Sequence, residues 1–285
     1  MNYLDLTLPS VAENLALDEA LLLEAEAGGR SELLRFWEWP TPIVILGAGS
    51  RLTADVNQLA CQADGVAIFR RSSGGGTVLL GHGCLCYSLI LSYDRHPTLR
   101  EIHSSFRFIL GRVRDAFARL VPSRGSGIQS QGSGVRSQEP GVRSQESGVS
   151  SQPLNSLLPP DPWFLTPDSC LELAGTSDLS LAGRKISGNS QQRKRRFLLH
   201  HGTILYAFDA KLVDRYLLMP IRQPDYRLQR NHSEFLTNFS APASELRSRL
   251  LTAWSATAPF DSWPRETVRQ LAEDKYGRPE WIRRR

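Results

Sequence analysis

A repetitive segment near the middle of the chain sets the strongest limit on how this sequence can fold. From position 126 to position 153 a seven-residue unit occurs four times, as SGIQSQG, SGVRSQE, PGVRSQE and SGVSSQP. Coiled-coil heptads need two apolar seam positions and good helix formers, whereas each unit here offers one apolar residue beside Gly, Ser or Pro. Such a segment cannot bury enough apolar surface to offset the entropy of ordering it. We therefore predict a flexible low-complexity insertion over residues 123–160, which interrupts a single domain spanning residues 1–285.

The composition of the whole chain is that of a globular protein. Hydrophobic residues make up 41% and charged residues 22%, which argues against general disorder. The net charge is +5, and the basic runs at 193–196 and 283–285 lack the interleaved aromatic residues of a nucleic-acid-binding stripe. No apolar run approaches the roughly 18 residues of a membrane span, and the first residues do not resemble a signal peptide. Four cysteines are too few for a disulfide scaffold in a chain of this length. We expect a cytoplasmic protein without nucleic-acid or membrane partners.

Hydrophobic periodicity predicts helices and strands that do not alternate strictly. Ser10 and Glu13 have the spacing of a capping box and predict a helix start, with Asp18 as a charge at the edge of its apolar stripe. A second amphipathic helix is expected from Leu99 to Leu120. The remaining helices are expected at 210–218, 243–254 and 265–272. The expected strands cover 33–39, 43–46, 66–70, 85–93 and 197–208, with a hairpin of 178–181 and 185–186. This order predicts an α+β fold of mixed β-sheets flanked by helices.

The densest candidate for a binding site is the sequence RRSSGGGTV at positions 70–78. A predicted strand runs into two arginines and then three glycines, whose backbone N–H groups can approach an anion closely. The arginines suit a carboxylate or phosphate held by charge-assisted hydrogen bonds. The glycine spacing fits neither a P-loop nor a dinucleotide fingerprint. A glycine-rich turn with surface arginines is the equally weighted alternative.

A second candidate is the lysine in the sequence GRKISGNSQ at positions 183–191. Lysine offers a compact positive charge with three donors, which suits a phosphate or an acyl carbonyl oxygen, although an ordinary hairpin lysine has the same appearance. Farther along, His200 and His201 are adjacent in a predicted strand, so their side chains point to opposite faces. They cannot ligate one metal together, and no Cys/His quartet occurs elsewhere, so we expect no metal site.

In this order, RRSSGGGTV, GCLCYSLIL, GRKISGNSQ and HHGTIL resemble the catalytic domain of the lipoate–protein ligase A family. The opening NLALDE and LRFWEW fit the same pattern, and the resemblance covers nearly the whole chain outside the repeats. The wider group includes lipoyl and octanoyl transferases and biotin protein ligases. The resemblance implies a biotin/lipoate protein ligase catalytic-domain fold and an enzyme that attaches a lipoyl group to a lysine of a carrier protein.

The resemblance also assigns roles to residues of the two candidate motifs and of the HHGTIL segment. Lys185 would contact the acyl carbonyl, with Ser187, Gly188 and Asn189 shaping a loop beside it. The remaining substrate-binding residues that it implies are Arg70, Arg71, Ser73, Gly74, Gly75, Gly76, Thr77, His201, Gly202 and Thr203.

Two mechanisms are compatible with this resemblance. In a lipoate–protein ligase, ATP, with Mg²⁺, converts free lipoate to an acyl-adenylate, and the lysine of a lipoyl-domain or H-protein-type carrier then displaces AMP. This is the reading we favour from the sequence. In an octanoyltransferase, an octanoyl group passes from acyl carrier protein to a cysteine and then to the lysine, and no cofactor is needed. Cys170 lies 15 residues before Lys185, a spacing that resembles the cysteine-dependent octanoyltransferases. Cys84 and Cys86 are instead expected to be small buried hydrophobic residues. A non-catalytic lipoyl- or biotin-binding regulator is a third possibility.

We predict that deleting residues 126–152 leaves folding and activity nearly unchanged, because the segment has no apolar pattern to contribute to a core. The thermal midpoint of the deletion variant and its activity should be compared with those of the full chain. A large drop in the thermal midpoint would contradict this prediction.

Overall fold

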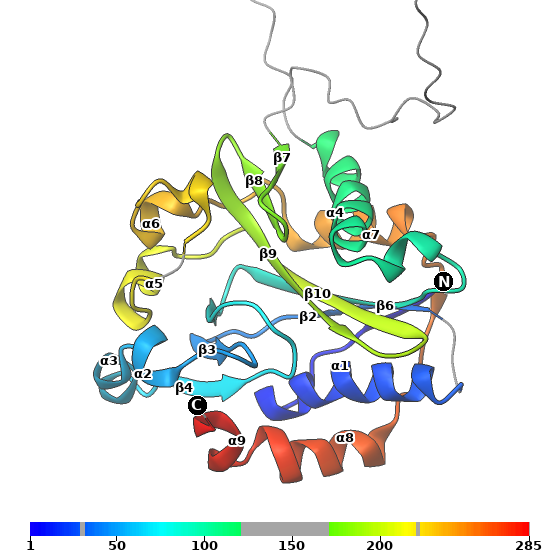
Figure 1. Cartoon of the computed structure of the whole chain (residues 1–285), viewed down its shortest axis with the longest axis horizontal. Coiled ribbons are helices and arrows are strands. Elements are labelled where there is room, and N and C mark those ends of the chain that lie inside the picture. The colour runs from blue at the N-terminus through cyan, green and yellow to red at the C-terminus, as the bar shows by residue number, and fades with distance from the viewer. Residues whose placement is uncertain (29–31, 121–170, 221–222, 285) are drawn as a thin grey trace, which may run out of the picture. The chain divides into compact units, whose positions relative to one another are not determined.

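Two β-sheets form the framework of the described residues (Figure 1). The computed structural model describes residues 1–28, 32–120, 171–220 and 223–284, and all of them belong to one compact unit of the chain. The larger sheet contains, in spatial order, β11 (Ala258–Pro259), β1 (Asn2–Asp5), β2 (Leu33–Trp37), β6 (Cys84–Ser92), β10 (Phe197–Leu205), β9 (Arg184–Arg193), β8 (Asp178–Leu181) and β7 (Leu171–Ala174). The smaller sheet contains β4 (Ala67–Arg70), β3 (Ile43–Leu46) and β5 (Val78–Leu80).

Both sheets mix parallel and antiparallel pairs. In the larger sheet β1 runs parallel to β2 and β11, whereas β2, β6, β10, β9, β8 and β7 pair antiparallel in succession. In the smaller sheet β3 is parallel to β4 and antiparallel to β5. The predicted α+β fold with mixed sheets is therefore confirmed. The predicted insertion at 123–160 lies outside the described residues and remains a prediction.

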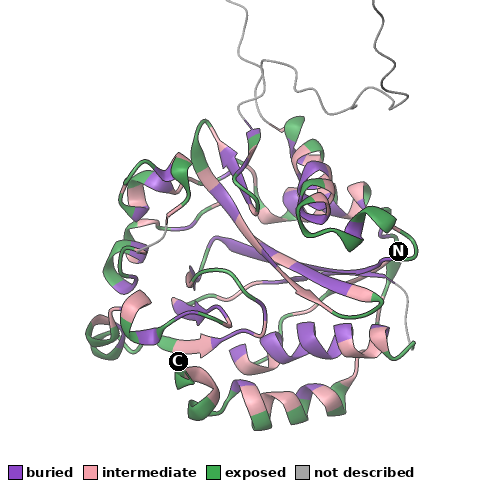
Figure 2. Cartoon of the chain, in the orientation of Figure 1, coloured by how far each residue is buried: buried purple, intermediate pink, exposed green. Residues whose placement is uncertain are grey.

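The middle strands of the larger sheet are buried on both faces. Along β2, Leu34 and Phe36 face one hydrophobic core, while Leu33 and Trp37 face a second core on the opposite side. Every residue of β6 is buried, as its colouring in Figure 2 shows. Because side chains alternate between the faces, a strand covered on both sides needs apolar residues in sequence. This explains the continuous apolar runs that predicted these strands.

Helices supply the cover on each side of the larger sheet (Figure 1). One face carries α1 (Val11–Glu26), which also packs against α8 (Arg265–Leu271) and the π-helical turn η3 (Ala272–Tyr276). The other face carries α4 (Ile102–Ala118) and α7 (Ala243–Ala253). The capping box at the start of α1 is confirmed, because Ser10 Oγ accepts from the Glu13 N–H and the Glu13 carboxylate accepts from the Ser10 N–H.

A third core lies beneath the smaller sheet. It is formed with α2 (Leu52–Asp55), α3 (Gln58–Ala63) and α5 (Lys211–Tyr216). The other short elements are the 3₁₀ turns η1 (Pro97–Arg100) and η2 (Asp225–Arg227), together with α6 (His232–Phe235) and α9 (Pro279–Arg283). Leu99, which we expected in the second long helix, lies in η1, and Ile102 at the start of α4 is exposed.

The predicted hairpin forms, but its second strand is much longer than expected. Ala182 and Gly183 connect β8 to β9 with φ angles of 51° and 71°, as a tight two-residue turn between twisted strands requires. β9 continues to Arg193 and pairs with β10 over most of its length. The prediction that residues 187–189 shape a loop is therefore wrong. They form the middle of a strand, since cross-strand hydrogen bonds to β10 outweigh the turn preference of Gly and Asn.

Asp18 is not the boundary charge that its position in α1 suggested. Its carboxylate lies 2.5 Å from the Arg35 guanidinium of β2 and accepts a 2.8 Å hydrogen bond from the Ser88 hydroxyl of β6. Arg35 is fully buried and also donates to the backbone and side-chain oxygens of Asn14. A buried polar cluster thus joins α1 to the neighbouring strands β2 and β6.

Replacing Arg35 by Met should lower the free energy of unfolding by about 3–5 kcal/mol, because Asp18 would remain buried without its cation. Removing both charges, in the double variant Arg35→Met with Asp18→Asn, should be less harmful than the sum of the single changes. The exposed pair Arg269–Glu266 provides the control, since Arg269→Met should change stability far less than Arg35→Met does. Denaturant titration measures four variants: Arg35→Met, Asp18→Asn, the double variant and Arg269→Met. Equal effects of Arg35→Met and Arg269→Met would contradict the prediction.

Candidate active site

The glycine-rich loop after β4 is folded around the guanidinium of Arg71. Arg71 Nη2 donates to the carbonyl oxygens of Gly74 at 2.6 Å and Gly76 at 2.8 Å, and Nε donates to Ser73 Oγ at 3.1 Å. Gly75 between them has a φ of 80°, a left-handed conformation that glycine adopts without strain. A side chain at Gly47 would collide with the Gly75 carbonyl oxygen, so the turn after β3 also needs glycine. The arginine therefore fixes the loop from within.

Arg70, the first arginine of the motif, points away from this loop. Its Nη1 donates at 2.8 Å to the carbonyl oxygens of Gly47 and Ser50, and its Nε donates at 3.0 Å to the Ile282 carbonyl of α9. Arg70 is fully buried and lines neither of the two cavities described below. The structure thus gives Arg70 a supporting place beneath the loop rather than the predicted contact with substrate.

The two adjacent histidines of β10 lie on opposite faces of the sheet, as predicted. His201 Nε2 lies 2.6 Å from Ser73 Oγ, and the same hydroxyl oxygen accepts a hydrogen bond from Arg71 Nε. Burial, together with the charge of Arg71, lowers the pKa of His201 to about 3, so the ring is neutral. On the other face His200 packs against Phe106, and burial lowers its pKa to about 3 as well.

Lys185 reaches across the hairpin to a carboxylate. Its Nζ lies 2.8 Å from Asp178 Oδ1, and Asp178 Oδ2 accepts a 2.5 Å hydrogen bond from Tyr226 of η2. A β-bulge between Leu179 and Ser180 shifts the register of β8 against β9. The hydrogen bond from Tyr226 fixes the Asp178 carboxylate, and this carboxylate in turn orients the Lys185 ammonium group.

Two glycines make room for the polar side chains of this wall. A Cβ at Gly188 would lie 2.8 Å from Lys185 Nζ, and one at Gly202 would lie 1.9 Å from Asn189 Oδ1. The space at Gly202 lets Asn189 accept a 2.6 Å hydrogen bond from the Tyr87 hydroxyl. Both glycines are thus required by close side-chain approach, and not by a turn.

An inner cavity of 170 Å³ lies between the glycine-rich loop and the strands β9 and β10. Its apolar wall consists of Leu15, Trp37, Ile45, Val78, Leu80 and Cys86. The polar wall includes Asp18, Ser88 and the neutral His201. Lys185 lies on its lining as well, so an apolar chain in this space would end beside an ammonium group.

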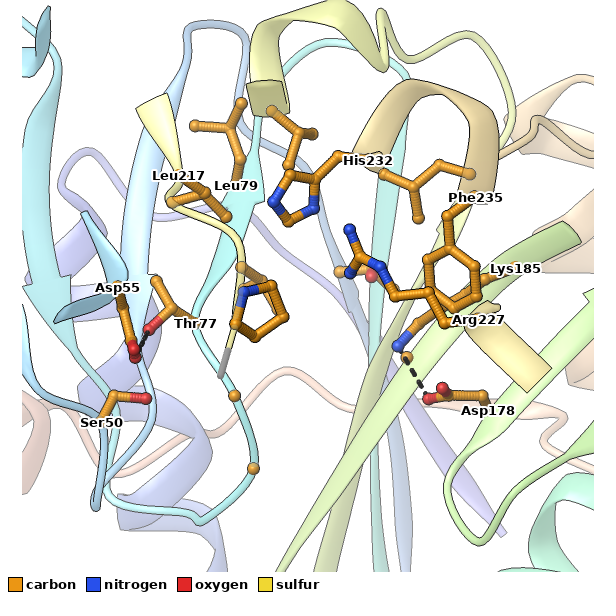
Figure 3. Close-up of a pocket in the computed structure, with 18 of the residues that line it drawn as sticks. Ser50, Asp55, Thr77, Leu79, Asp178, Lys185, Leu217, Arg227, His232 and Phe235 are labelled. Atoms are coloured by element: carbon orange, nitrogen blue, oxygen red, sulfur yellow. Dashed lines mark hydrogen bonds and ion pairs between the residues drawn. The ribbon is translucent and has the colours of Figure 1, made fainter. Parts of the chain in front are cut away.

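A larger outer cavity of 1080 Å³ shares a wall with the inner one. Both are lined by Gly75, Gly76, Thr77, Val78, Asp178, Lys185, Gly188 and Thr203. Beyond that shared wall the outer cavity is bounded by apolar residues of α5 and β10, and by Arg227, His232 and Phe235 (Figure 3). Thr77 is held by a 2.6 Å hydrogen bond to Asp55 of α2.

Most of the predicted site residues, which come from three sequence motifs, converge on these cavities. Those on the lining are Arg71, Gly75, Gly76, Thr77, Lys185, Ser187, Gly188, Asn189, His201, Gly202 and Thr203. Ser73 and Gly74 stand behind the lining, where Ser73 bonds His201 and the Gly74 carbonyl accepts from Arg71 and from Ser190.

Sequence reasoning missed Asp178, Tyr226, Arg227 and His232. Asp178 belongs to a predicted strand, and a search for charge pairs across the hairpin could have found it. No local signal marks Tyr226, Arg227 or His232, because short turns of the chain bring them to the cavity.

Burial makes the thiols of β6 unreactive. It raises the pKa of Cys84 to about 12 and that of Cys86 well above its usual range, as expected for small buried hydrophobic residues. Cys170 lies outside the described residues. Across the described ranges there is no cluster of His, Cys, Asp and Glu suited to a metal ion. Nor does any helix there have the length and apolar character to span a membrane.

Comparison with known proteins first establishes the class of protein. Residues 10–241 match the family model described as the lipoyl protein ligase A/B catalytic domain. The chain therefore belongs to the lipoyl protein ligase A/B catalytic-domain family, and the prediction that it is an enzyme of this kind is confirmed.

Two curated relatives are similar to this chain over most of its length. Octanoyltransferase LipM of Carboxydothermus hydrogenoformans is 26% identical over 286 residues, which cover 96% of this chain and 94% of the relative. Octanoyltransferase LipM of Symbiobacterium thermophilum is 29% identical over 224 residues, covering 76% of this chain and 69% of the relative.

Among solved structures, the bi-partite lipoate protein ligase of Thermoplasma acidophilum has a TM-score of 0.70 at 20% identity, covering 99% of this chain and 95% of its own. A lipoate-protein ligase A bound with ATP has a TM-score of 0.69 at 20% identity and covers 99% of each chain. These similarities confirm the predicted ligase-type fold.

Proposed function

We propose that this enzyme is a protein octanoyltransferase, which moves an octanoyl group from an acyl carrier protein to a lysine of a lipoyl-domain or H-protein-type carrier. The observation that carries the proposal is the inner cavity, whose apolar wall lies beside Lys185. An eight-carbon chain would bury its methylenes there, each contributing about 0.8 kcal/mol, and present its carbonyl oxygen to the ammonium group. The relatives named octanoyltransferase LipM favour this reading over the ATP-dependent ligase that the sequence first favoured.

The charges around the outer cavity support a transferase. Its described lining carries the cations Arg51, Lys185 and Arg227 and the carboxylates Asp55 and Asp178. This balance suits a donor of low charge better than the polyanionic triphosphate of ATP. A thioester donor needs no nucleotide, because its carbonyl is already activated toward a nucleophile.

The reaction would proceed in two balanced steps. The Cys170 thiolate adds to the donor carbonyl, the bond from that carbon to the carrier sulfur breaks, and the carrier leaves as a thiol after taking up a proton. The neutral amine of the acceptor lysine then adds to the enzyme thioester. The new carbon–nitrogen bond forms the amide, the bond to Cys170 breaks, and the proton lost by the amine restores the thiol.

Lys185 has the same task in both steps. Each addition places negative charge on the former carbonyl oxygen, and an ammonium group oriented in advance by Asp178 stabilises that charge without reorganisation. His201 is neutral and bonded to Ser73, so it adds no competing charge to the wall.

The proposal is tested on a purified lipoyl domain supplied either with octanoyl-acyl carrier protein or with lipoate and ATP. We expect the product mass to show an octanoyl group, formed without ATP, and the Cys170→Ala variant to be slower by on the order of a thousandfold or more. Cys61→Ala is the matched control, because burial raises the pKa of that thiol and it lies away from both cavities. Product formed only with lipoate and ATP would establish the ligase instead, and no product with either donor would favour a binding regulator.

Replacing Lys185 by Ala should slow acyl transfer about a hundredfold and leave the fold intact, because the ammonium group stabilises oxyanion charge and contributes little packing. Lys185→Arg should restore little activity, since a planar guanidinium does not fit where a compact ammonium is needed. The exposed Lys194 serves as the control, and Lys194→Ala should leave the rate unchanged. The acyl-transfer rates and thermal midpoints of the three variants test this prediction. A decrease in rate below about twofold for Lys185→Ala would overturn the role assigned to Lys185.

A further inference from the structure

Arg227 is a buried cation on the wall of the outer cavity. It ends the turn η2 and is only 4% exposed, yet it lies on the cavity lining with Lys185. In Figure 3 its guanidinium group points into the same space as the Lys185 ammonium group, beside His232. A charge in such a place is costly unless something in the cavity compensates it.

The backbone around Arg227 is shaped to hold the guanidinium group. Arg227 Nε donates to the Arg230 carbonyl at 2.9 Å, and Arg230 Nε donates back to the Arg227 carbonyl at 3.0 Å. Between them Leu228 and Gln229 have φ angles of 53° and 60°, which are unfavourable for residues with side chains. Strain of this kind persists where surrounding contacts enforce it, and it often accompanies a functional constraint. The Arg227 guanidinium is also stacked over Phe235 at 4.8 Å, which fixes its plane.

The charge of Arg227 has no ion-pair partner in residues 1–28, 32–120, 171–220 and 223–284. Nη2 makes a weak contact with the Met219 sulfur, and Nη1 makes no hydrogen bond to these residues. The carboxylate of Asp214 affects Arg227 electrostatically, but its oxygens accept the N–H groups of His232 and Ser233. Burial and the charge of Arg227 lower the pKa of His232, so this neighbour does not add a second charge.

We propose that Arg227 binds a phosphate group of the acyl donor in the outer cavity. The described lining carries three cations and two carboxylates, so its net charge is +1. This charge matches the single negative charge of a phosphodiester. The rest of the lining is largely apolar and suits a pantetheine arm, and 1080 Å³ gives the arm room to fold. The favoured source of the phosphate is therefore the phosphopantetheine arm of the carrier, which rests on the proposed transferase function. A nucleotide phosphate is the other source of the same chemistry.

Three synthetic donors separate these sources: octanoyl-pantetheine, which lacks a phosphate, octanoyl-phosphopantetheine capped as a methyl phosphodiester, and octanoyl-adenylate. We expect the wild-type enzyme to prefer octanoyl-phosphopantetheine to octanoyl-pantetheine. Arg227→Met should lower kcat/KM about tenfold or more for the phosphate-bearing thioester and leave octanoyl-pantetheine nearly unaffected. Arg227→Lys should restore part of the preference. Lys194→Met, which removes an exposed cation that lines neither cavity, is the control and should leave the rates with all three donors unchanged.

The remaining outcomes are also decisive. Equal slowing with all three donors would mean that Arg227 only supports the fold, and would overturn the inference. Sensitivity confined to octanoyl-adenylate would keep the phosphate site but assign it to a nucleotide, overturning the carrier arm as its source. If the wild-type enzyme uses neither thioester, the transferase proposal fails by itself, and the adenylate measurements still test Arg227.

Discussion

The guanidinium group of Arg71 holds the loop on which both cavities depend. Its hydrogen bonds to Gly74 and Gly76 close the loop, and a 3.4 Å contact to the Ile45 carbonyl connects it to the smaller sheet. From the same loop, Ser73 contacts His201 and the Gly74 carbonyl accepts from Ser190, both on the larger sheet. Buried carbonyls need donors and a buried guanidinium needs acceptors, so each satisfies the other. The two sheets therefore meet here through a polar loop, beside which the cavities remain open.

The shared wall of the cavities separates the tasks that acyl transfer requires. Apolar side chains form one wall of the inner space, against which a hydrocarbon chain gains most from leaving water. Charge is concentrated at Lys185 and Arg227, where oxygen atoms of the reacting group and of its carrier would lie. Because Asp178 is itself held by Tyr226, the lysine is oriented before any ligand arrives. Such preorganisation is effective because no reorganisation is needed at the moment of reaction.

Short-range sequence patterns predicted most of the helices and strands. They did not predict most of the contacts between segments that lie far apart in the sequence. The capping box at Ser10, the hairpin turn at Ala182 and the strand at 43–46 follow from short-range chemistry, and the structure contains all three. The different positions of the Arg70 and Arg71 side chains could not be derived from the sequence. Arg70 donates to the Ile282 carbonyl of α9 and to carbonyls after β3, whereas Arg71 donates to its own loop. The length of β9 was not predicted either, because it is set by pairing with β10, a strand that comes later in the chain.

The C-terminal helices, which lie outside the family match at residues 10–241, contact the start of the glycine-rich loop. Trp281 Nε1 donates to the Arg70 carbonyl at 2.8 Å, and Arg70 returns a hydrogen bond to the neighbouring Ile282 carbonyl. Tyr276 of η3 donates to the Glu19 carboxylate of α1 and lies 3.0 Å from the Ser72 hydroxyl at the start of the glycine-rich loop. These contacts join the first helix, the loop and the last helix of the described chain at one place. A loop rich in glycine has many conformations to lose on ordering, and bonds at its anchored end reduce that loss. The C-terminal segment therefore contributes to the site without lining either cavity, by fixing the end from which Arg71 organises the loop.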